Sequence, residues 1–255
     1  GGFTSASRIR WGTQVFALPK RQRNMHALRG APFRASVISR HLAPALQARP
    51  ESVAAMATAA RSSLGRIALG DTALFVCDIQ ERFREAIQGF PAVVDVSRRM
   101  IRAAEVFQIP VIVTEQYPKA LGKTVSELTE VLPKDAQVFE KTKFSMLIDE
   151  VSEFLTRRDD IKRILIVGIE AHVCVLQTTL ELLDRGYEVH ILTDAVSSRY
   201  ALDRSTALHR LSKAGAILTT SETASFQLMG NTTYPNFKAI SALFKEKKAD
   251  SLPGL

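Results

Sequence analysis

The stretch that most constrains the fold runs from Ile164 to Leu183, where a short apolar run is followed by an amphipathic pattern. Ile164–Val167 is rich in β-branched residues, which favours a buried strand, and Gly168 is expected to break it. Val173–Leu183 has the apolar spacing of a helix. A buried strand that leads directly into a helix is the repeating unit of folds built on a parallel sheet, so this stretch predicts an α/β protein.

The same alternation extends through the rest of the chain from Thr72. Apolar runs predict six strands, at residues 72–77, 111–114, 137–140, 161–167, 188–192 and 216–219. Helical patterns occupy residues 92–107, 125–132, 146–157, 173–183, 201–214, 223–229 and 235–247. This order predicts a doubly wound, mostly parallel six-stranded sheet with helices on both faces.

Residues 1–66 differ from the rest of the chain in their charge. They contain ten Arg and one Lys against one acid, Glu51, and carry a net charge of +10, whereas residues 67–255 carry −2. An extension rich in Arg, Ser and Ala and poor in acids is typical of a mitochondrial transit peptide, although a disordered basic tail has the same composition. We therefore expect an irregular basic extension at 1–66, a folded domain at 67–255 and a mitochondrial location.

Composition also bears on the partners of this chain. No apolar run is long enough to cross a bilayer, so no membrane span is expected. The nearly neutral domain does not suggest a nucleic-acid-binding surface, and contact with RNA or with a larger assembly is expected only through residues 1–66. The two cysteines, Cys77 and Cys174, are too few for a disulfide framework and favour a reducing environment. Cys77 lies inside a predicted strand and is interpreted as a core residue.

Cys174 is the first candidate for chemistry because it lies on the first turn of a predicted helix. Free backbone NH groups and the positive end of the helix dipole stabilise a thiolate there. A lowered thiol pKa is what a cysteine nucleophile needs. The alternative is an inert core cysteine, since free cysteines are often buried.

Two charged residues are expected to lie near this thiol. Asp78, Lys141 and Cys174 follow the first, third and fourth predicted strands, and the carboxyl ends of parallel strands share one edge of a sheet. There a carboxylate accepts the thiol proton and an ammonium group stabilises the thiolate, which together suit attack on a carbonyl. The polar loop Glu115–Gly122, after the second strand, is either a substrate wall or an ordinary connection.

Five motifs, in chain order, resemble the isochorismatase-like cysteine hydrolases. They are FVCDIQERF at residues 75–83, VIVTEQYPKALG at 111–122, EKTKFSM at 140–146, GIEAHVCVLQTTLELLDRGYEVH at 168–190 and TTSETASFQL at 219–228. The resemblance implies a triad of Asp78 as base, Lys141 as electrostatic partner and Cys174 as nucleophile. It also implies a dimer or a higher homo-oligomer.

The resemblance further implies how the nucleophile is surrounded. Lys143 is a rival to Lys141, which is preferred because the family places its lysine four residues before the serine that is Ser145 here. In the family a non-proline cis peptide precedes the nucleophile, and it falls at Ile169–Glu170 in this chain. Such a bond would turn the NH of Glu170 toward the NH of Cys174 and form an oxyanion hole.

Other residues of these motifs are candidates for binding substrate. Gln116 and Tyr117 are expected to contact it, and His172 either lines the pocket or is a hydrogen-bonded structural histidine. Family members that deaminate nicotinamide hold a metal ion through an aspartate and histidines shortly after the first strand. Because no histidine lies between Asp78 and Glu115, a metal-dependent nicotinamidase is disfavoured, and no metal or cofactor is expected.

Two functions follow from these observations. In the first, Cys174 attacks a small amide or related carbonyl substrate, Asp78 moves the proton, and water releases the thioester. In the second, the chain is a non-catalytic structural subunit of a mitochondrial assembly, which keeps the hydrolase fold and is anchored through its basic extension.

Overall fold

The structure, a computed structural model, describes residues 64–247 and Leu252; nearly all of the predicted basic extension lies outside these residues. The strands are β1 (Thr72–Cys77), β2 (Val111–Gln116), β3 (Gln137–Lys141), β4 (Arg163–Ile169), β5 (Glu188–Ser197) and β6 (Ile217–Thr219). The helices are α2 (Phe90–Phe107), α3 (Pro118–Leu121), α4 (Ser126–Thr129), α5 (Asp149–Arg157), α6 (Leu176–Asp184), α7 (Ala201–Lys213), α8 (Ser221–Met229) and α9 (Phe237–Lys245). No helix among the described residues is long and apolar enough to span a bilayer.

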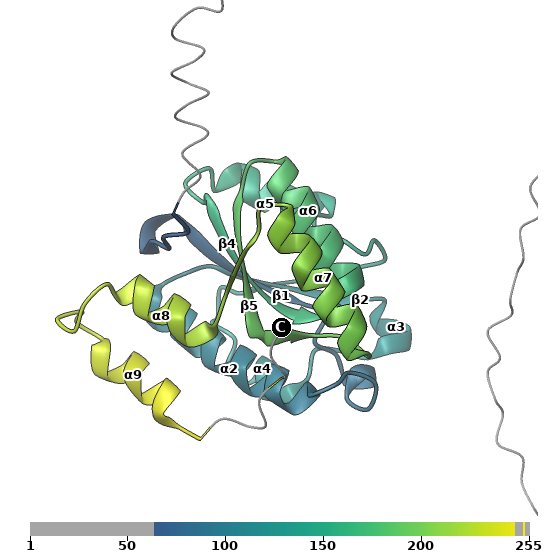
Figure 1. The fold of residues 1–255 in the computed structure, drawn as a ribbon, viewed down its shortest axis with the longest axis horizontal. Coiled ribbons are helices and arrows are strands. Elements are labelled where there is room, and N and C mark those ends of the chain that lie inside the picture. The colour runs from purple at the N-terminus through teal and green to yellow at the C-terminus, as the bar shows by residue number, and fades with distance from the viewer. Residues whose placement is uncertain (1–63, 248–251, 253–255) are drawn as a thin grey trace, which may run out of the picture. The chain divides into compact units, whose positions relative to one another are not determined.

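The six strands form one sheet in the order β3-β2-β1-β4-β5-β6, and every neighbouring pair is parallel (Figure 1). The predicted α/β fold with a six-stranded parallel sheet is therefore confirmed. The strand order reverses between β1 and β4, because β2 and β3 lie on one side of β1 and β5 and β6 lie beyond β4. Doubly wound sheets form their binding crevice at such a point, beyond the carboxyl ends of the strands.

Helices cover both faces of this sheet (Figure 1). Along β1, Ala73 and Phe75 pack in a core with residues of α5, α6 and α7, whereas Leu74 and Val76 pack in a core with residues of α2, α4, α8 and α9. All six residues of β1 are buried. A strand covered on both faces is apolar at successive positions, which is why β1 has no polar alternation in its sequence.

Gly168 does not break β4, contrary to the expectation from sequence. The strand continues to Ile169, and Gly168 pairs in register with Cys77 of β1. Gly168 has a φ of +150°, and a Cβ atom there would lie 2.5 Å from the Cβ of Cys77. Glycine is therefore needed for the close approach of two strands, and it does not mark the end of one.

β5 continues to Ser197, beyond the predicted end at residue 192, because its last residues pair with the end of β4 after a shift in register, and α7 supplies further partners for its backbone. The buried side chain of Arg204 donates from Nε to the carbonyl of Val196 at 2.8 Å and from Nη2 to the carbonyl of Thr193 at 2.5 Å. These contacts come from a different element of the chain, so the local pattern of β5 could not indicate them.

Arg99 of α2 anchors the end of α9. Its side chain is buried, pairs with Asp95 at 3.0 Å, and donates to the backbone carbonyls of Leu243, Glu246 and Lys247. The last carbonyls of a helix have no partners within the helix, and Arg99 supplies them with donors. The guanidinium group thereby joins two helices on one face of the sheet.

We expect Arg99→Ala to lower the free energy of unfolding by about 2–4 kcal/mol, because the helix carbonyls and the carboxylate of Asp95 lose their partner. Urea titration measures the loss. The control is Arg98→Ala, since Arg98 is more exposed and its ion pairs are long, at 3.6 and 3.9 Å. The control should cost at most about 1 kcal/mol. Equal losses in the two variants would contradict the anchoring role.

The burial of His190 is expected to make the stability of the domain depend on pH. The residue is fully buried in β5, where Nε2 lies 2.7 Å from Glu188 Oε1 and Nδ1 has no hydrogen-bond partner. Burial lowers the pKa of His190 despite the opposing effect of Glu188. The unfolded chain therefore takes up a proton near pH 6.5, above the pH at which the folded protein does so.

The free energy of unfolding should consequently fall as the pH drops below about 6.5, until the lowered pKa of His190 is reached. Urea titrations between about pH 5.5 and 8 test this. His190→Gln should remove most of the slope over this range, whereas His209→Gln, at an exposed position on α7, should keep it. A slope that persists in His190→Gln would assign the dependence to other groups.

Candidate active site

Asp78 lies directly after β1 with a left-handed backbone (φ 55°) and is 1% exposed. Its Oδ1 accepts a hydrogen bond from the hydroxyl of Thr114 at 2.7 Å, and its Oδ2 accepts one from Lys141 Nζ at 2.7 Å. Its backbone NH donates to the carbonyl of Thr114. Both oxygens of this buried carboxylate thus have partners, which compensates the cost of burying a charge.

Lys141 ends β3, and its ammonium group is buried among oxygen atoms. Besides Asp78, Nζ contacts Gln116 Oε1 at 2.6 Å and the carbonyls of Phe144 at 2.9 Å and Lys143 at 3.2 Å. Burial alone would lower the pKa of Lys141, but negatively charged neighbours, with the hydrogen-bonded carboxylate of Asp78 among them, outweigh burial and raise the pKa above its ordinary value. The group therefore remains an ammonium ion.

The structure brings Lys141, and not its rival Lys143, to Asp78. Lys143 Nζ instead donates to the carbonyl of Leu147 at 2.9 Å and pairs with Glu181 at 2.9 Å, and 48% of its side chain is exposed. The two lysines are only two residues apart, but Lys141 ends β3 and Lys143 lies beyond it, and their side chains have different partners.

Cys174 is 6% exposed and lies in a π-helical turn, Ala171–Val175, that leads into α6. Turns of this kind are frequent at functional sites. The thiol lies within electrostatic range of the Lys141 ammonium group. Thr178 of α6 donates to the carbonyl of Cys174 at 2.6 Å and accepts from the NH of Met146 at 2.9 Å, which ties the lysine loop to the nucleophile turn. Asp78, Lys141 and Cys174 thus follow strand ends at the same edge of the sheet.

The cis peptide expected at Ile169–Glu170 is wrong. No cis peptide occurs among the described residues, and the chain reverses after β4 through Glu170 itself, which has a left-handed backbone (φ 56°, ψ 63°). Its carbonyl accepts from the NH of Val173 at 2.9 Å. The backbone torsions of one residue accomplish the turn for which a cis bond was expected.

Gln116 and Tyr117, expected to bind substrate, occupy different positions. The amide of Gln116 accepts from Lys141 and donates to the carbonyl of Thr142 at 2.9 Å, so it orients the lysine. Tyr117 has a left-handed backbone (φ 36°) and is 51% exposed. It lines a cavity of about 290 Å³ together with Glu140, Lys141 and other residues of this loop.

The sequence analysis missed Gln80, which fixes the loop that carries these residues. Gln80 is fully buried, and its Oε1 accepts from the NH of Gln116 at 2.7 Å. Its Nε2 donates to the carbonyls of Gln116 at 3.0 Å and Gly122 at 2.6 Å. Thr114, which bonds Asp78, was also missed. The available signal was a polar residue at the end of an apolar run, which also marks ordinary strand ends.

His172 belongs to a polar cluster beside the nucleophile turn. Its Nδ1 lies 3.1 Å from the hydroxyl of Ser198 and 3.3 Å from Glu170 Oε2, and its Nε2 lies 3.8 Å from Asp203. Glu170 Oε1 in turn forms an ion pair with Arg199 Nε at 2.8 Å. These contacts join the turn after β4 to the segment after β5, and they leave His172 half-buried at the edge of the site.

Cys77 is buried in the core, as its place in an apolar strand indicated, but its thiol lies within hydrogen-bonding reach of Cys174. Burial, the hydrogen bond to Cys174 and the negative charges of Asp78 and Cys174 raise the pKa of Cys77 well above its ordinary value. Cys77 is therefore a neutral thiol next to the candidate nucleophile.

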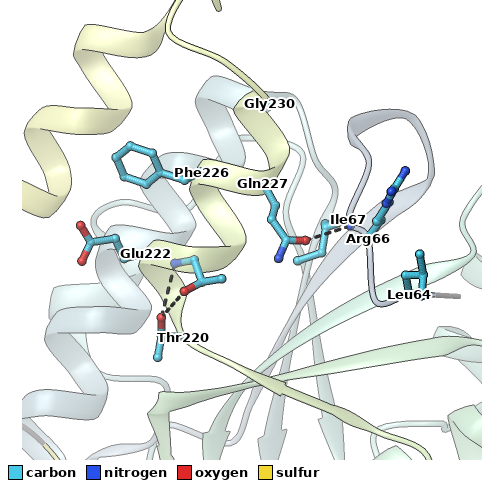
Figure 2. A pocket seen from close by; sticks show the side chains of 9 residues that line it. Leu64, Arg66, Ile67, Thr220, Glu222, Phe226, Gln227 and Gly230 are labelled. Carbon is cyan, nitrogen blue, oxygen red and sulfur yellow. Dashed lines mark hydrogen bonds between the residues drawn. The ribbon is translucent and has the colours of Figure 1, made fainter.

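Other features of the described residues lie outside this arrangement. Among residues 64–247, no group of three or more His, Cys, Asp or Glu side chains is placed to hold a metal ion. A larger cavity of about 980 Å³ opens between residues 64–67 and α8 (Figure 2). Gln227 crosses it and accepts from the NH of Ile67 at 3.4 Å. None of the three candidate catalytic residues lines it.

Comparison with known proteins gives consistent matches. The family profile described as "Isochorismatase domain" matches residues 72–223. Human isochorismatase domain-containing protein 2 is 48% identical over 194 residues, which cover 76% of this chain and 92% of the relative.

Solved structures agree with the sequence matches. The MAR1 ribonuclease from Caenorhabditis elegans is 47% identical, with a TM-score of 0.70 over 74% of this chain and 100% of that one. The YcaC gene product from Escherichia coli, described as an octameric hydrolase of unknown specificity, is 22% identical with a TM-score of 0.64 over 71% of this chain and 89% of that one, and it shares the fold. The chain therefore belongs to the isochorismatase-domain family.

Proposed function

We propose that this chain is a hydrolase that uses Cys174 as a nucleophile on a small amide or a related carbonyl substrate. The observation that carries the proposal is the buried ion pair of Asp78 and Lys141, 2.7 Å apart, whose ammonium group also lies within electrostatic range of Cys174. Burying an ion pair is costly, and the cost is explained if the pair serves chemistry at the adjacent sulfur.

Each residue has a defined role in this reaction. Asp78 accepts the proton of the Cys174 thiol, and the thiolate attacks the substrate carbonyl. Lys141 stabilises the negative charge shared by the carboxylate and the sulfur. The oxyanion hole expected from the NH groups of Glu170 and Cys174 relied on a cis bond at Ile169–Glu170, which is trans in the structure, so no oxyanion hole is assigned. Asp78 then gives the proton to the leaving amine and activates the water that hydrolyses the thioester.

A panel of small primary amides, assayed for ammonia release, tests the proposal. RNA belongs in the same panel because the related C. elegans protein is named a ribonuclease. The net charge of −2 on residues 67–255 favours a small neutral substrate over a polyanion. Amide turnover that requires Cys174 supports the proposal, whereas RNA cleavage without amide turnover would replace it.

The alternative function, a structural subunit of a mitochondrial assembly, has no support in the described residues or in the family matches. The extension that motivated it lies outside the described residues. Homo-oligomerisation, which light scattering on the purified protein measures, stays a prediction. Gel filtration of a mitochondrial lysate distinguishes the hydrolase from the structural subunit by the size of the particle that contains the protein. Elution as a free homo-oligomer would count against a place in a larger assembly.

We further propose that residues 1–66 direct import into mitochondria. A fusion of residues 1–66 to a fluorescent protein should be found in mitochondria, because an Arg-rich and acid-poor segment is typical of a mitochondrial transit peptide. Fluorescence microscopy checks the location. The control is the same fusion with its ten Arg residues replaced by Gln, which should remain in the cytosol. Cytosolic fluorescence of the unaltered fusion would remove the transit function.

A further inference from the structure

The proposed hydrolysis leaves one reactive group of the site unused, the thiol of Cys77. It lies within hydrogen-bonding reach of Cys174 and is fully buried. Its backbone is held between β2 and β4, and Gly168 lets β4 approach so closely that a Cβ atom there would lie 2.5 Å from the Cβ of Cys77. The only two cysteines of the chain thus lie in the same buried cluster, with Cys174 as a hydrogen-bond partner of Cys77.

We propose that Cys174 is a site of reversible oxidation by peroxides, with Cys77 as the thiol that resolves the oxidised sulfur into an intramolecular disulfide. The inference goes beyond the proposed hydrolysis and rests on it only in requiring a reactive Cys174. The oxidant in this step is hydrogen peroxide or a small organic hydroperoxide, which is small enough to reach Cys174, a residue that is 6% exposed.

Peroxide is the oxidant, and the disulfide forms in two steps. The Cys174 thiolate attacks one peroxide oxygen, the O–O bond breaks, and the departing hydroxide takes a proton to become water, which leaves a sulfenic acid on Cys174. The sulfur of Cys77 then attacks the sulfur of Cys174 and the S–O bond breaks. The oxygen leaves as water with the thiol proton of Cys77, and the disulfide has formed.

The electrostatics of the site favour this order of events. While Cys174 is a thiolate, its negative charge and its hydrogen bond help to raise the pKa of Cys77, so Cys77 stays protonated. Conversion of Cys174 to a neutral sulfenic acid removes that charge, while the Lys141 ammonium group, which lowers the pKa of Cys77, remains in place. Cys77 therefore becomes easier to deprotonate once its partner is oxidised.

A peptide map of the full chain tests the proposal without any substrate. Reduced protein is treated with hydrogen peroxide, alkylated, and digested with trypsin in the absence of reductant. Cleavage after arginine gives peptide 67–82, with Cys77, and peptide 164–185, with Cys174; neither contains methionine, so oxygen added to methionine cannot confuse the result. A non-reducing gel shows whether a cross-link lies within one chain.

We expect the two peptides to appear joined, with the loss of two hydrogens, and to separate on treatment with dithiothreitol. In Cys77→Ala, and in Cys77→Ser as a second variant, Cys174 should instead gain two oxygens that dithiothreitol does not remove. In Cys174→Ala, Cys77 should stay unmodified under the same exposure, because it is buried and protonated.

Two results would overturn the inference and differ in what they mean. If Cys174 of the unaltered chain gains two oxygens as it does in Cys77→Ala, without a cross-link, the resolving role of Cys77 is wrong and the reactive thiol of the proposed hydrolase stands. If peroxide modifies neither cysteine, Cys174 lacks the reactivity that both proposals need.

Discussion

Replacement of Cys174 by alanine is expected to lower kcat by about 10⁴- to 10⁶-fold, because removal of a nucleophile disables the residues that act with it. Ammonia release from the best amide of the substrate panel measures the loss. Cys174→Ser is the matched variant, since it replaces the thiol by a hydroxyl group of similar size that forms an anion far less readily. It should also lose nearly all activity.

The fold should survive this substitution. Alanine removes one sulfur atom from a turn that is otherwise held by backbone contacts and by Thr178, so the expected loss of stability is about 1.5 kcal/mol or less. Thermal unfolding and circular dichroism establish that the inactive variant is folded. Turnover by Cys174→Ala within about tenfold of the unaltered chain would exclude covalent catalysis by this residue.

Replacement of Lys141 by alanine is expected to lower the free energy of unfolding by about 3–5 kcal/mol, as well as to abolish activity. The reason is that the carboxylate of Asp78, which is 1% exposed, loses its charged partner and stays buried. Urea titration at pH 7 measures the loss. Lys143→Ala is the control two residues away, and because Lys143 is half-exposed it should cost about 1 kcal/mol or less.

A double variant, Asp78→Asn with Lys141→Met, separates the cost of an unpaired charge from the cost of lost packing. Removal of both charges should recover part of the stability that Lys141→Ala loses, although the site stays inactive. If Lys141→Ala and Lys143→Ala are equally stable, the ion pair contributes nothing to the fold, and its burial would have to be explained by catalysis alone.

The sequence by itself determined the layers of this fold. Central strands such as β1, β2 and β4 are covered on both faces and are apolar at successive positions. Helices repeat their apolar residues every three or four positions, so the strands and the long helices were predicted near their observed places. Because all six strands are parallel, residues that follow them had to share an edge. Asp78, Lys141 and Cys174 are therefore expected at one edge of the sheet from the sequence alone.

The tertiary structure alone decided which groups touch within that edge. Gln116 was expected to contact substrate, which stays a prediction, and the structure adds that its amide accepts a hydrogen bond from Lys141. Cys77 was expected in the core, where it lies, and the structure adds Cys174 as its hydrogen-bond partner. Gly168 was read as a strand breaker, and only the register of β1 against β4 shows that it admits Cys77. The periodicity of the sequence indicates the face of a strand or helix on which a residue lies. The hydrogen bonds of that residue depend instead on which strand lies beside it in the sheet, and that strand is distant in the sequence.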